Sequence, residues 1–270
     1  MTQYINNSII KVNNLYKSFH VGIQNVPILK NISFEVKAED FLIIFGPSGC
    51  GKSTVLHTIL GLEEPTKGKI LFLGKDLYDG ITEDDRSDFR KQHVGMVYQQ
   101  PNWIRSLTVV ENVAFPLLLL GQEKKITLEK ARAALGMVEM VNWAPYVPAE
   151  LSSGQQQRVS LARALVTNPE VIIADEPTGN LDFESGQGLM QLLTTLNKKA
   201  KKTIVMVTHD LEYLKFAKTA VRMFNGEIVG VYTEKEKDKL MGEIKSKRGN
   251  GDYERTNKQS VIVSPKNIQL

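Results

Sequence analysis

Three short, uninterrupted apolar runs stand out along the chain, at residues 41–45, 171–174 and 204–207. Each run is followed by a turn rich in glycine or polar residues and then by a segment with a helix-like pattern. Continuous apolar runs of this length are typical of strands that are buried on both faces of a parallel sheet. Their alternation with helices predicts an α/β fold whose functional loops lie at the carboxyl ends of the strands.

The start of the chain shows a different pattern. Residues 9–12 and 32–36 have the composition of two strands, and the stretch between them is rich in turn-forming residues at 22–27. Two strands joined in this way are typical of an antiparallel pair. We therefore expect an antiparallel β subdomain ahead of the parallel sheet.

The middle of the chain, at about residues 100–165, carries few strand signals and much helical content. Within it Val159, Ala162 and Leu165 recur at helical spacing, and residues 127–140 predict a further helix. We interpret this region as a helical subdomain inserted into the α/β core.

The segment after the first apolar run has the pattern of a phosphate-binding loop. Residues 46–54 have the sequence Gly-Pro-Ser-Gly-Cys-Gly-Lys-Ser-Thr and match G-x-x-x-x-G-K-[ST] between a predicted strand and a predicted helix. A glycine-rich turn with a chance lysine does not explain those flanking elements. The glycines let backbone N–H groups surround a polyphosphate, Lys52 can reach the β- and γ-phosphates, and the Ser53 hydroxyl can ligate Mg²⁺. The predicted nucleotide contacts are Gly46, Pro47, Ser48, Gly49, Cys50, Gly51, Lys52, Ser53 and Thr54.

Two carboxylates end the second apolar run. Asp175 is placed to hold Mg²⁺ through water, and Glu176 lies one residue further, at the γ-phosphate end. A carboxylate there can orient an attacking water or accept its proton. An apolar strand that ends in two acids is common, so this pattern gains its meaning from the phosphate loop. Together they predict hydrolysis of a bound nucleoside triphosphate.

Residues 151–158 have the sequence Leu-Ser-Ser-Gly-Gln-Gln-Gln-Arg and resemble the LSGGQ signature of ABC-type ATPases. The resemblance covers about residues 9–230, with the family's motifs in their usual order. It implies ATP and Mg²⁺ as ligands and a head-to-tail dimer. In that dimer each ATP lies between the phosphate loop of one chain and the signature of the other. The second chain is then an identical copy or a close paralogue.

The resemblance also assigns roles to residues that mean little alone. Phe19 matches the aromatic residue that stacks on adenine, and Gln99 matches the glutamine that approaches Mg²⁺ and the attacking water. His209 matches the histidine that contacts the γ-phosphate, and Asp182 lies in the loop that communicates across the dimer. The implied catalytic residues are Glu176, His209 and Gln99. The implied metal contacts are Ser53, Gln99 and Asp175. The implied cofactor contacts outside the phosphate loop are Phe19, Ser152, Ser153, Gly154, Gln155 and Asp182.

Ser153 departs from the family's pattern, which has glycine at this position. A Cβ atom restricts φ, but this residue lies at a predicted helix N-terminus, where φ is expected to be negative in any case. We therefore expect the fold to tolerate Ser153, and we expect any consequence to fall on the rate of hydrolysis.

In fold, the resemblance implies an α/β P-loop NTPase core of the ABC ATPase type, with an N-terminal antiparallel β subdomain and an inserted α-helical subdomain. We expect the ATPase domain at residues 1–233, with its helical subdomain at about 100–165. Residues 234–270 are charged and are expected to be a flexible C-terminal tail, with a short exposed helix at 234–247 and disorder at 248–257. A solvated tail is favoured over one that contacts anionic lipid or RNA.

Charge and composition restrict the function classes. The 34 Lys and Arg residues against 30 Asp and Glu leave a net charge of +4, which is too small to predict nucleic acid as the main partner. The one cysteine, Cys50, cannot form an internal disulfide. The polar start lacks the pattern of a secretory signal, and no apolar run approaches the roughly 18 residues of a membrane span. We expect a cytoplasmic protein at the inner face of the cell membrane.

The resemblance implies that the chain drives a separate membrane permease by hydrolysing ATP. In the family a coupling helix of the permease rests on the Gln99 loop and the helical subdomain. Trp103, Ile104 and Leu107 are candidate apolar contacts on that surface, and packing in the core explains them almost equally well.

Two stretches, at 108–121 and 175–182, look like those of the lipoprotein-release and macrolide-export ATPases. The membrane partners of that group usually carry a large extracytoplasmic domain, so we favour export, lipoprotein release or mechanotransmission. The alternative is the ATPase of an importer, and a regulatory or soluble ABC ATPase is less favoured. Soluble members usually carry two cassettes or a long coiled coil, and residues 99–151 are too short for the latter and lack sustained heptads.

Overall fold

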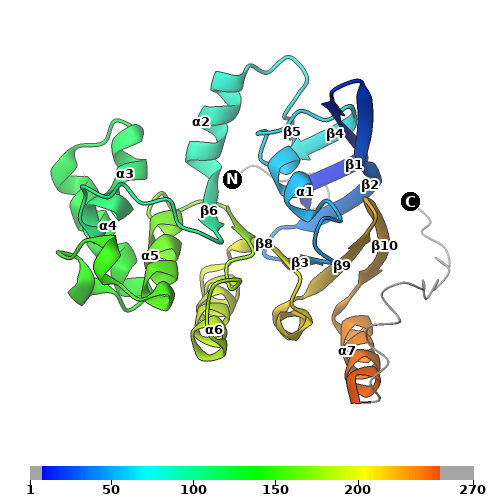
Figure 1. Cartoon of the computed structure of the whole chain (residues 1–270). Coiled ribbons are helices and arrows are strands. Elements are labelled where there is room, and N and C mark those ends of the chain that lie inside the picture. Colours follow the sequence, from blue (N-terminus) through cyan, green and yellow to red (C-terminus); the bar gives the residue numbers. More distant parts are fainter. Residues whose placement is uncertain (1–7, 250–270) are drawn as a thin grey trace.

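The computed structural model describes residues 8–249 and shows two β-sheets surrounded by helices (Figure 1). The strands of the larger sheet are Phe41–Phe45 (β3), Val94–Tyr98 (β6), Val171–Asp175 (β7), Thr203–Thr208 (β8), Thr219–Phe224 (β9) and Glu227–Tyr232 (β10). They are ordered β10-β9-β3-β8-β7-β6, all parallel except β10, which pairs antiparallel with β9. The three predicted apolar runs are confirmed as β3, β7 and β8, which lie side by side.

The smaller sheet is antiparallel and comes from the first part of the chain. Its strands are Ser8–Val21 (β1), Gln24–Lys37 (β2), Lys67–Phe72 (β4) and Lys75–Asp76 (β5). They are ordered β2-β1-β4-β5, and Ile10 of β1 lies opposite Val36 of β2, so the predicted antiparallel pair is confirmed. The turn is shorter than predicted, because residues 24–27 already belong to β2.

The helices confirm the inserted helical subdomain. They are Lys52–Ile59 (α1), Glu83–His93 (α2), Val109–Leu119 (α3), Lys124–Met137 (α4), Ser153–Leu165 (α5), Phe183–Ala200 (α6) and Glu234–Gly249 (α7), with short 3₁₀ helices at Val141–Trp143 (η2), Pro148–Glu150 (η3) and Leu211–Phe216 (η4). In Figure 1, α3, α4 and α5 form the green group to one side of the large sheet. The helix predicted at 127–140 begins three residues earlier, as α4, and ends at Met137.

Strand β3 explains why its sequence is apolar without interruption. Phe41, Ile43 and Phe45 face a core shared with the helical subdomain, at most 2% exposed. Leu42 and Ile44 face the opposite core, shared with α1 and the small sheet, and are fully buried. The sheet is therefore covered on both faces, which leaves the loops at the carboxyl ends of its strands as the accessible parts.

Helix α7 confirms the short helix predicted at 234–247, but one side of its first turns is buried and not exposed as predicted. Its residue Lys237 is 2% exposed, and Leu240 and Met241 pack against the larger core. The first turns of the helix are thus held on the domain, although the boundary at residue 233 stays a prediction. Residues 250–270, including most of the predicted disorder, lie outside the described residues. Within residues 8–249, no helix is both long and apolar enough to cross a membrane.

Candidate nucleotide-binding site

Two glycines of the predicted phosphate loop, residues 46–54, lie where no side chain fits. A Cβ atom on Gly46 would overlap the backbone oxygen of Met223. Gly51 has a left-handed φ of +98°, and a Cβ atom there would lie 2.8 Å from the Leu29 side chain. The loop therefore keeps its bare backbone against β2 and β9, and its last three residues are the first residues of α1, which begins at Lys52.

The Lys52 side chain is buried, at 5% exposure, and its ammonium group lies within the loop. Nζ donates to the carbonyl oxygens of Gly46, at 3.0 Å, and Pro47, at 3.1 Å. It also lies 3.8 Å from Glu176 Oε1. A buried ammonium group needs such partners to offset its lost hydration. These contacts bring the predicted phosphate-binding lysine and the predicted catalytic carboxylate together.

Ser53 and Asp175 meet beside Lys52, although they are far apart in the sequence. Ser53 Oγ donates to Asp175 Oδ1 at 3.2 Å. Burial raises the pKa of the Asp175 carboxyl, while the hydrogen bond from Ser53 opposes that rise. Hydroxyl and carboxylate oxygens are ligands that Mg²⁺ prefers, and Mg²⁺ usually takes its other ligands from water and substrate phosphates. The two side chains therefore fit the predicted cation.

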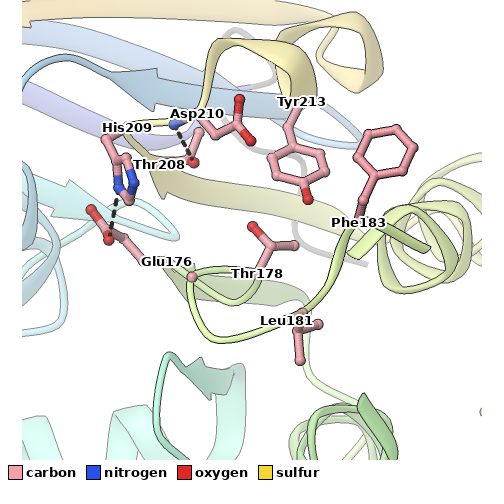
Figure 2. Close-up of a pocket in the computed structure, with 9 residues that line it drawn as sticks. Glu176, Thr178, Leu181, Phe183, Thr208, His209, Asp210 and Tyr213 are labelled. Atoms are coloured by element: carbon pink, nitrogen blue, oxygen red, sulfur yellow. Dashed lines mark hydrogen bonds and ion pairs between the residues drawn. The ribbon is translucent and has the colours of Figure 1, made fainter. Parts of the chain in front are cut away.

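Glu176 follows β7, and Figure 2 shows its carboxylate beside the His209 ring. Its Oε2 is 3.1 Å from His209 Nδ1, and the half-exposed His209 ring comes from the loop after the neighbouring strand β8. Glu176 also has a φ of +44°, a left-handed conformation that costs a non-glycine residue roughly 1 kcal/mol or more. Its N–H group donates to the Val207 carbonyl at 3.1 Å, which helps to hold this conformation.

A cavity of about 280 Å³ opens beside Glu176 and His209 (Figure 2). Its lining consists of Glu176, Thr178, Gly179, Leu181, Phe183, Thr208, His209, Asp210 and Tyr213. None of these residues belongs to the phosphate loop. The cavity is bounded by the loops that follow β7 and β8 and by residues at the starts of α6 and η4.

The signature residues form a second group at the start of α5. Ser152 caps this helix: its N–H donates to Gln155 Oε1 at 2.9 Å, and its Oγ accepts from the Gln155 N–H at 3.3 Å. Ser153 is the first residue of α5 and has no positive φ, which confirms the expected backbone conformation. The added Cβ atom is thus accommodated as an ordinary first helical residue.

The Asp182 loop lies next to the signature. Asp182 caps α6 and accepts hydrogen bonds from the Ser185 N–H, at 2.9 Å, and the Ser185 hydroxyl, at 2.8 Å. These bonds hold the pKa of the Asp182 carboxyl below its ordinary value. A Cβ atom on Gly154 would lie 2.8 Å from Ser185 Oγ, so the starts of α5 and α6 approach closely.

Gln99 and Phe19 occupy the two remaining predicted positions. The Gln99 amide lies against Gly179, where a Cβ atom would come within 2.6 Å of Gln99 Nε2. Phe19 lies on β1, 36% exposed, opposite Val26 of β2. Two residues further along β2, Ile28 contacts Gly51, so Phe19 lies on the strand pair that packs against the phosphate loop.

One residue that the sequence analysis missed connects these parts. Gln157 of α5 is 2% exposed, and its Nε2 donates to the carbonyls of Tyr98 at 2.9 Å, Gln99 at 3.3 Å and Pro177 at 2.7 Å. It thereby ties the signature helix to the segments that carry Gln99 and Glu176. A signal existed in the sequence: Gln157 precedes Leu161 by four residues, on the apolar face of the helix, where a polar side chain must find partners.

Replacing Gln157 by leucine should lower the free energy of unfolding by about 1–3 kcal/mol, because three backbone carbonyl groups, of Tyr98, Gln99 and Pro177, lose their common donor. ATP turnover should fall as well, because the Gln99 and Pro177 segments lose their common anchor. Urea unfolding and phosphate release measure the two effects. Gln191→Leu, on the exposed face of α6, is the matched control. Equal stability of both variants would show that the Gln157 contacts carry no net free energy.

Comparison with known proteins gives related chains over most of this length. The family model described as ABC transporter matches residues 29–179. The lipoprotein-releasing system ATP-binding protein LolD of Legionella pneumophila (strain Paris) is 43% identical over 209 residues, which cover 76% of this chain and 90% of that protein. The uncharacterized ABC transporter ATP-binding protein MJ1508 of Methanocaldococcus jannaschii is 41% identical over 222 residues, with coverage of 82% and 98%.

A solved structure extends the likeness to three dimensions. The dimeric post-hydrolysis state of the ATP-binding cassette MJ0796, bound to ADP and Pi, has a TM-score of 0.77 at 37% identity. It covers 83% of this chain and 98% of that one. The fold is therefore that of an ABC ATPase with its antiparallel β subdomain. The chain belongs to the ABC transporter family, as an ATP-binding subunit that hydrolyses ATP.

Proposed function

We propose that Glu176 prepares the water that attacks the γ-phosphate of ATP. The observation that supports this most is the position of its carboxylate, 3.8 Å from Lys52 and 3.1 Å from His209 at the end of β7. A carboxylate there can accept a proton from a water molecule aligned with a phosphate that Lys52 binds. Phosphoryl transfer requires mostly positioning and charge from the protein, which these residues supply.

The other site residues fit the remaining steps. The loop N–H groups and the N-terminus of α1 bind the phosphates, and Phe19 stacks on adenine. As the water oxygen bonds to the γ-phosphorus, its proton passes to Glu176 and the bond to the β-phosphate oxygen breaks. His209 donates to a γ-phosphate oxygen, and the Gln99 amide orients the water. The products are ADP and phosphate.

Ser53 and Asp175 are the residues that would hold Mg²⁺, with Gln99 as a further contact. Their oxygen atoms, 3.2 Å apart, are a suitable donor set next to the loop. When bound, the ion supplies positive charge to the β- and γ-phosphate oxygens. Lys52 supplies a further positive charge, so the two groups together would offset most of the negative charge of the triphosphate.

We infer further that two chains form the complete site, either identical copies or close paralogues. Within one chain the contacts join Lys52, Asp175, Glu176 and His209 into one group and place Ser152–Gln155 with Asp182 in another. A head-to-tail partner would present its second group to the first chain's ATP. The related cassette MJ0796 is a dimer in its solved structure, which supports this arrangement.

The membrane task that fits best is export or lipoprotein release through a separate permease with a large extracytoplasmic domain. Support comes from the 43% identity to a LolD protein that is named as part of a lipoprotein-releasing system. The chain would then work at the cytoplasmic face of the membrane, and dimer closure on ATP would move the permease. The helical subdomain with Trp103, Ile104 and Leu107 is its candidate contact surface. Import remains the second candidate.

Capture of the membrane partner tests this task. A tagged Glu176→Gln chain, expected to stay in its ATP-bound dimer, is recovered from detergent-solubilised native membranes with and without ATP, and its partners are identified by mass spectrometry. Lys52→Ala is the comparator that should not respond to ATP. The expected result is a membrane protein with few transmembrane helices and a large extracytoplasmic domain. A many-span permease with a solute-binding protein would establish import, and ribosomal or DNA-repair proteins alone would overturn a transport role.

A further inference from the structure

His209 follows the last residue of β8, and the short helix η4 begins two residues after it. Asp210 lies between them and caps η4: its Oδ1 accepts from the Glu212 N–H at 2.9 Å, and its own N–H donates to Thr208 Oγ1 at 3.0 Å. No flexible linker separates His209 from the first turn of η4. A displacement of η4 would therefore move the His209 ring relative to Glu176.

One side of η4 rests on the loop that follows Glu176. The Tyr213 hydroxyl points toward the Thr178 side chain in Figure 2. Tyr213 is 5% exposed, and a Cβ atom on Gly186 of α6 would overlap its hydroxyl. This side of η4 is thus held by close packing.

Helix α7 also contacts η4. It lies outside the part of the chain that carries the nucleotide motifs. Lys237 Nζ donates to the carbonyl oxygens of Ala217, at 2.5 Å, and Lys215, at 3.4 Å. These carbonyls belong to the last turn of η4 and the residue that caps it. Cations are favoured at helix C-termini, where the carbonyl groups lack partners within the helix.

The burial of Lys237 shows that this contact is specific. Its side chain is 2% exposed, whereas Lys235 and Lys239 of the same helix are exposed. Lysine is almost never fully buried unless its ammonium group is paired, because the lost hydration is costly. A buried ammonium group that donates to two backbone carbonyls accepts only a narrow range of positions for η4.

We propose that Lys237 is a positioning residue for hydrolysis: it clamps η4 from α7 so that His209 stays at Glu176. The proposal rests on the proposed role of His209 at the γ-phosphate. The proposal links the position of α7 to the rate of ATP hydrolysis. A partner that displaces this helix would therefore change the rate of ATP turnover. Lys237 itself touches no nucleotide.

Steady-state ATP hydrolysis by the full chain tests the proposal. Lys237→Met should lower kcat about tenfold, as expected for a displaced catalytic group, and leave KM for ATP within about twofold, because the phosphate loop is untouched. Lys237→Arg keeps the donors and should restore part of the loss. Lys239→Met, exposed on the same helix, should behave as the unchanged chain. A Lys237→Met chain with unchanged kcat, or with kcat and KM altered together, would overturn the clamp.

A double substitution separates positioning from general stability. In a His209→Ala chain, Lys237→Met should cause no further loss of kcat, because the group that it positions is gone. A further tenfold loss would assign Lys237 a structural role only. Should Lys237→Met fail to fold, Tyr213→Phe loosens η4 from its other side by one hydroxyl group and must show the same lack of additivity. His209→Ala with unchanged turnover would instead refute the proposed role of His209.

Discussion

A Glu176→Gln chain is expected to bind ATP with near-native affinity and to hydrolyse it at least about 100-fold more slowly. Glutamine has nearly the same shape as glutamate, so it can still contact His209 and a water molecule, but it cannot accept the water's proton. The affinity for ATP is expected to depend on Lys52 and the loop N–H groups, which the substitution leaves in place. The chain should therefore accumulate as an ATP-bound dimer.

Phosphate release at saturating ATP and light scattering with and without ATP measure the two consequences. The matched control is Glu170→Gln, at the opposite end of β7, where Glu170 Oε2 lies 3.1 Å from His93 Nδ1. The Glu170→Gln chain should hydrolyse ATP at the same rate as the unsubstituted chain. If Glu176→Gln also hydrolyses at this rate, another group activates the water and the proposed mechanism is wrong.

The backbone at residue 176 makes glutamine the informative replacement. With φ at +44°, the position is strained for glutamate and glutamine alike, so the exchange adds no backbone strain. Glycine would relieve the strain and remove the carboxylate together. A loss of turnover in Glu176→Gln at unchanged stability is therefore a loss of chemistry.

In the large sheet, the strands that form continuous apolar runs could be predicted from the sequence, and β6, β9 and β10 could not. β3, β7 and β8 lie inside the sheet, so each appears as a continuous apolar run. β6 and β10 lie at the two edges, and their residues alternate between more and less buried positions without forming such a run. β6 also follows α2 directly, with no turn signal between His93 and Val94.

Part of the candidate site could be predicted for a topological reason. Asp175 and Glu176 end β7, and His209 follows the neighbouring strand β8, so parallel pairing alone brings them to one edge of the sheet. No comparable rule of strand pairing predicts which groups Gln157 and Lys237 contact. Gln157 Nε2 binds carbonyls 59, 58 and 20 residues away, and Lys237 binds one 20 residues away. These pairs depend on how whole helices pack against the rest of the domain, and a local sequence pattern does not predict that packing.

Replacing Lys52 by alanine is expected to weaken ATP binding at least about 30-fold, the equivalent of about 2 kcal/mol for lost charged hydrogen bonds. The substitution also leaves the Gly46 and Pro47 carbonyls without their donor. In addition it removes the cation 3.8 Å from Glu176, so the carboxylate and the γ-phosphate would repel each other without compensation. Binding and turnover should thus fail together, unlike in Glu176→Gln.

Isothermal titration calorimetry of the Lys52→Ala chain with ATP and with ADP measures its affinity for each nucleotide and tests this prediction. Because Lys52 is expected to contact the β- and γ-phosphates, and Glu176 would repel mainly the γ-phosphate, the affinity for ATP should fall more than the affinity for ADP. Lys67→Ala, an exposed lysine on β4, should leave both affinities unchanged. Near-native binding of ATP to Lys52→Ala would contradict the assignment of the phosphate loop. An equal loss for both nucleotides would place Lys52 at the β-phosphate alone and leave the γ-phosphate to His209 and the partner's signature.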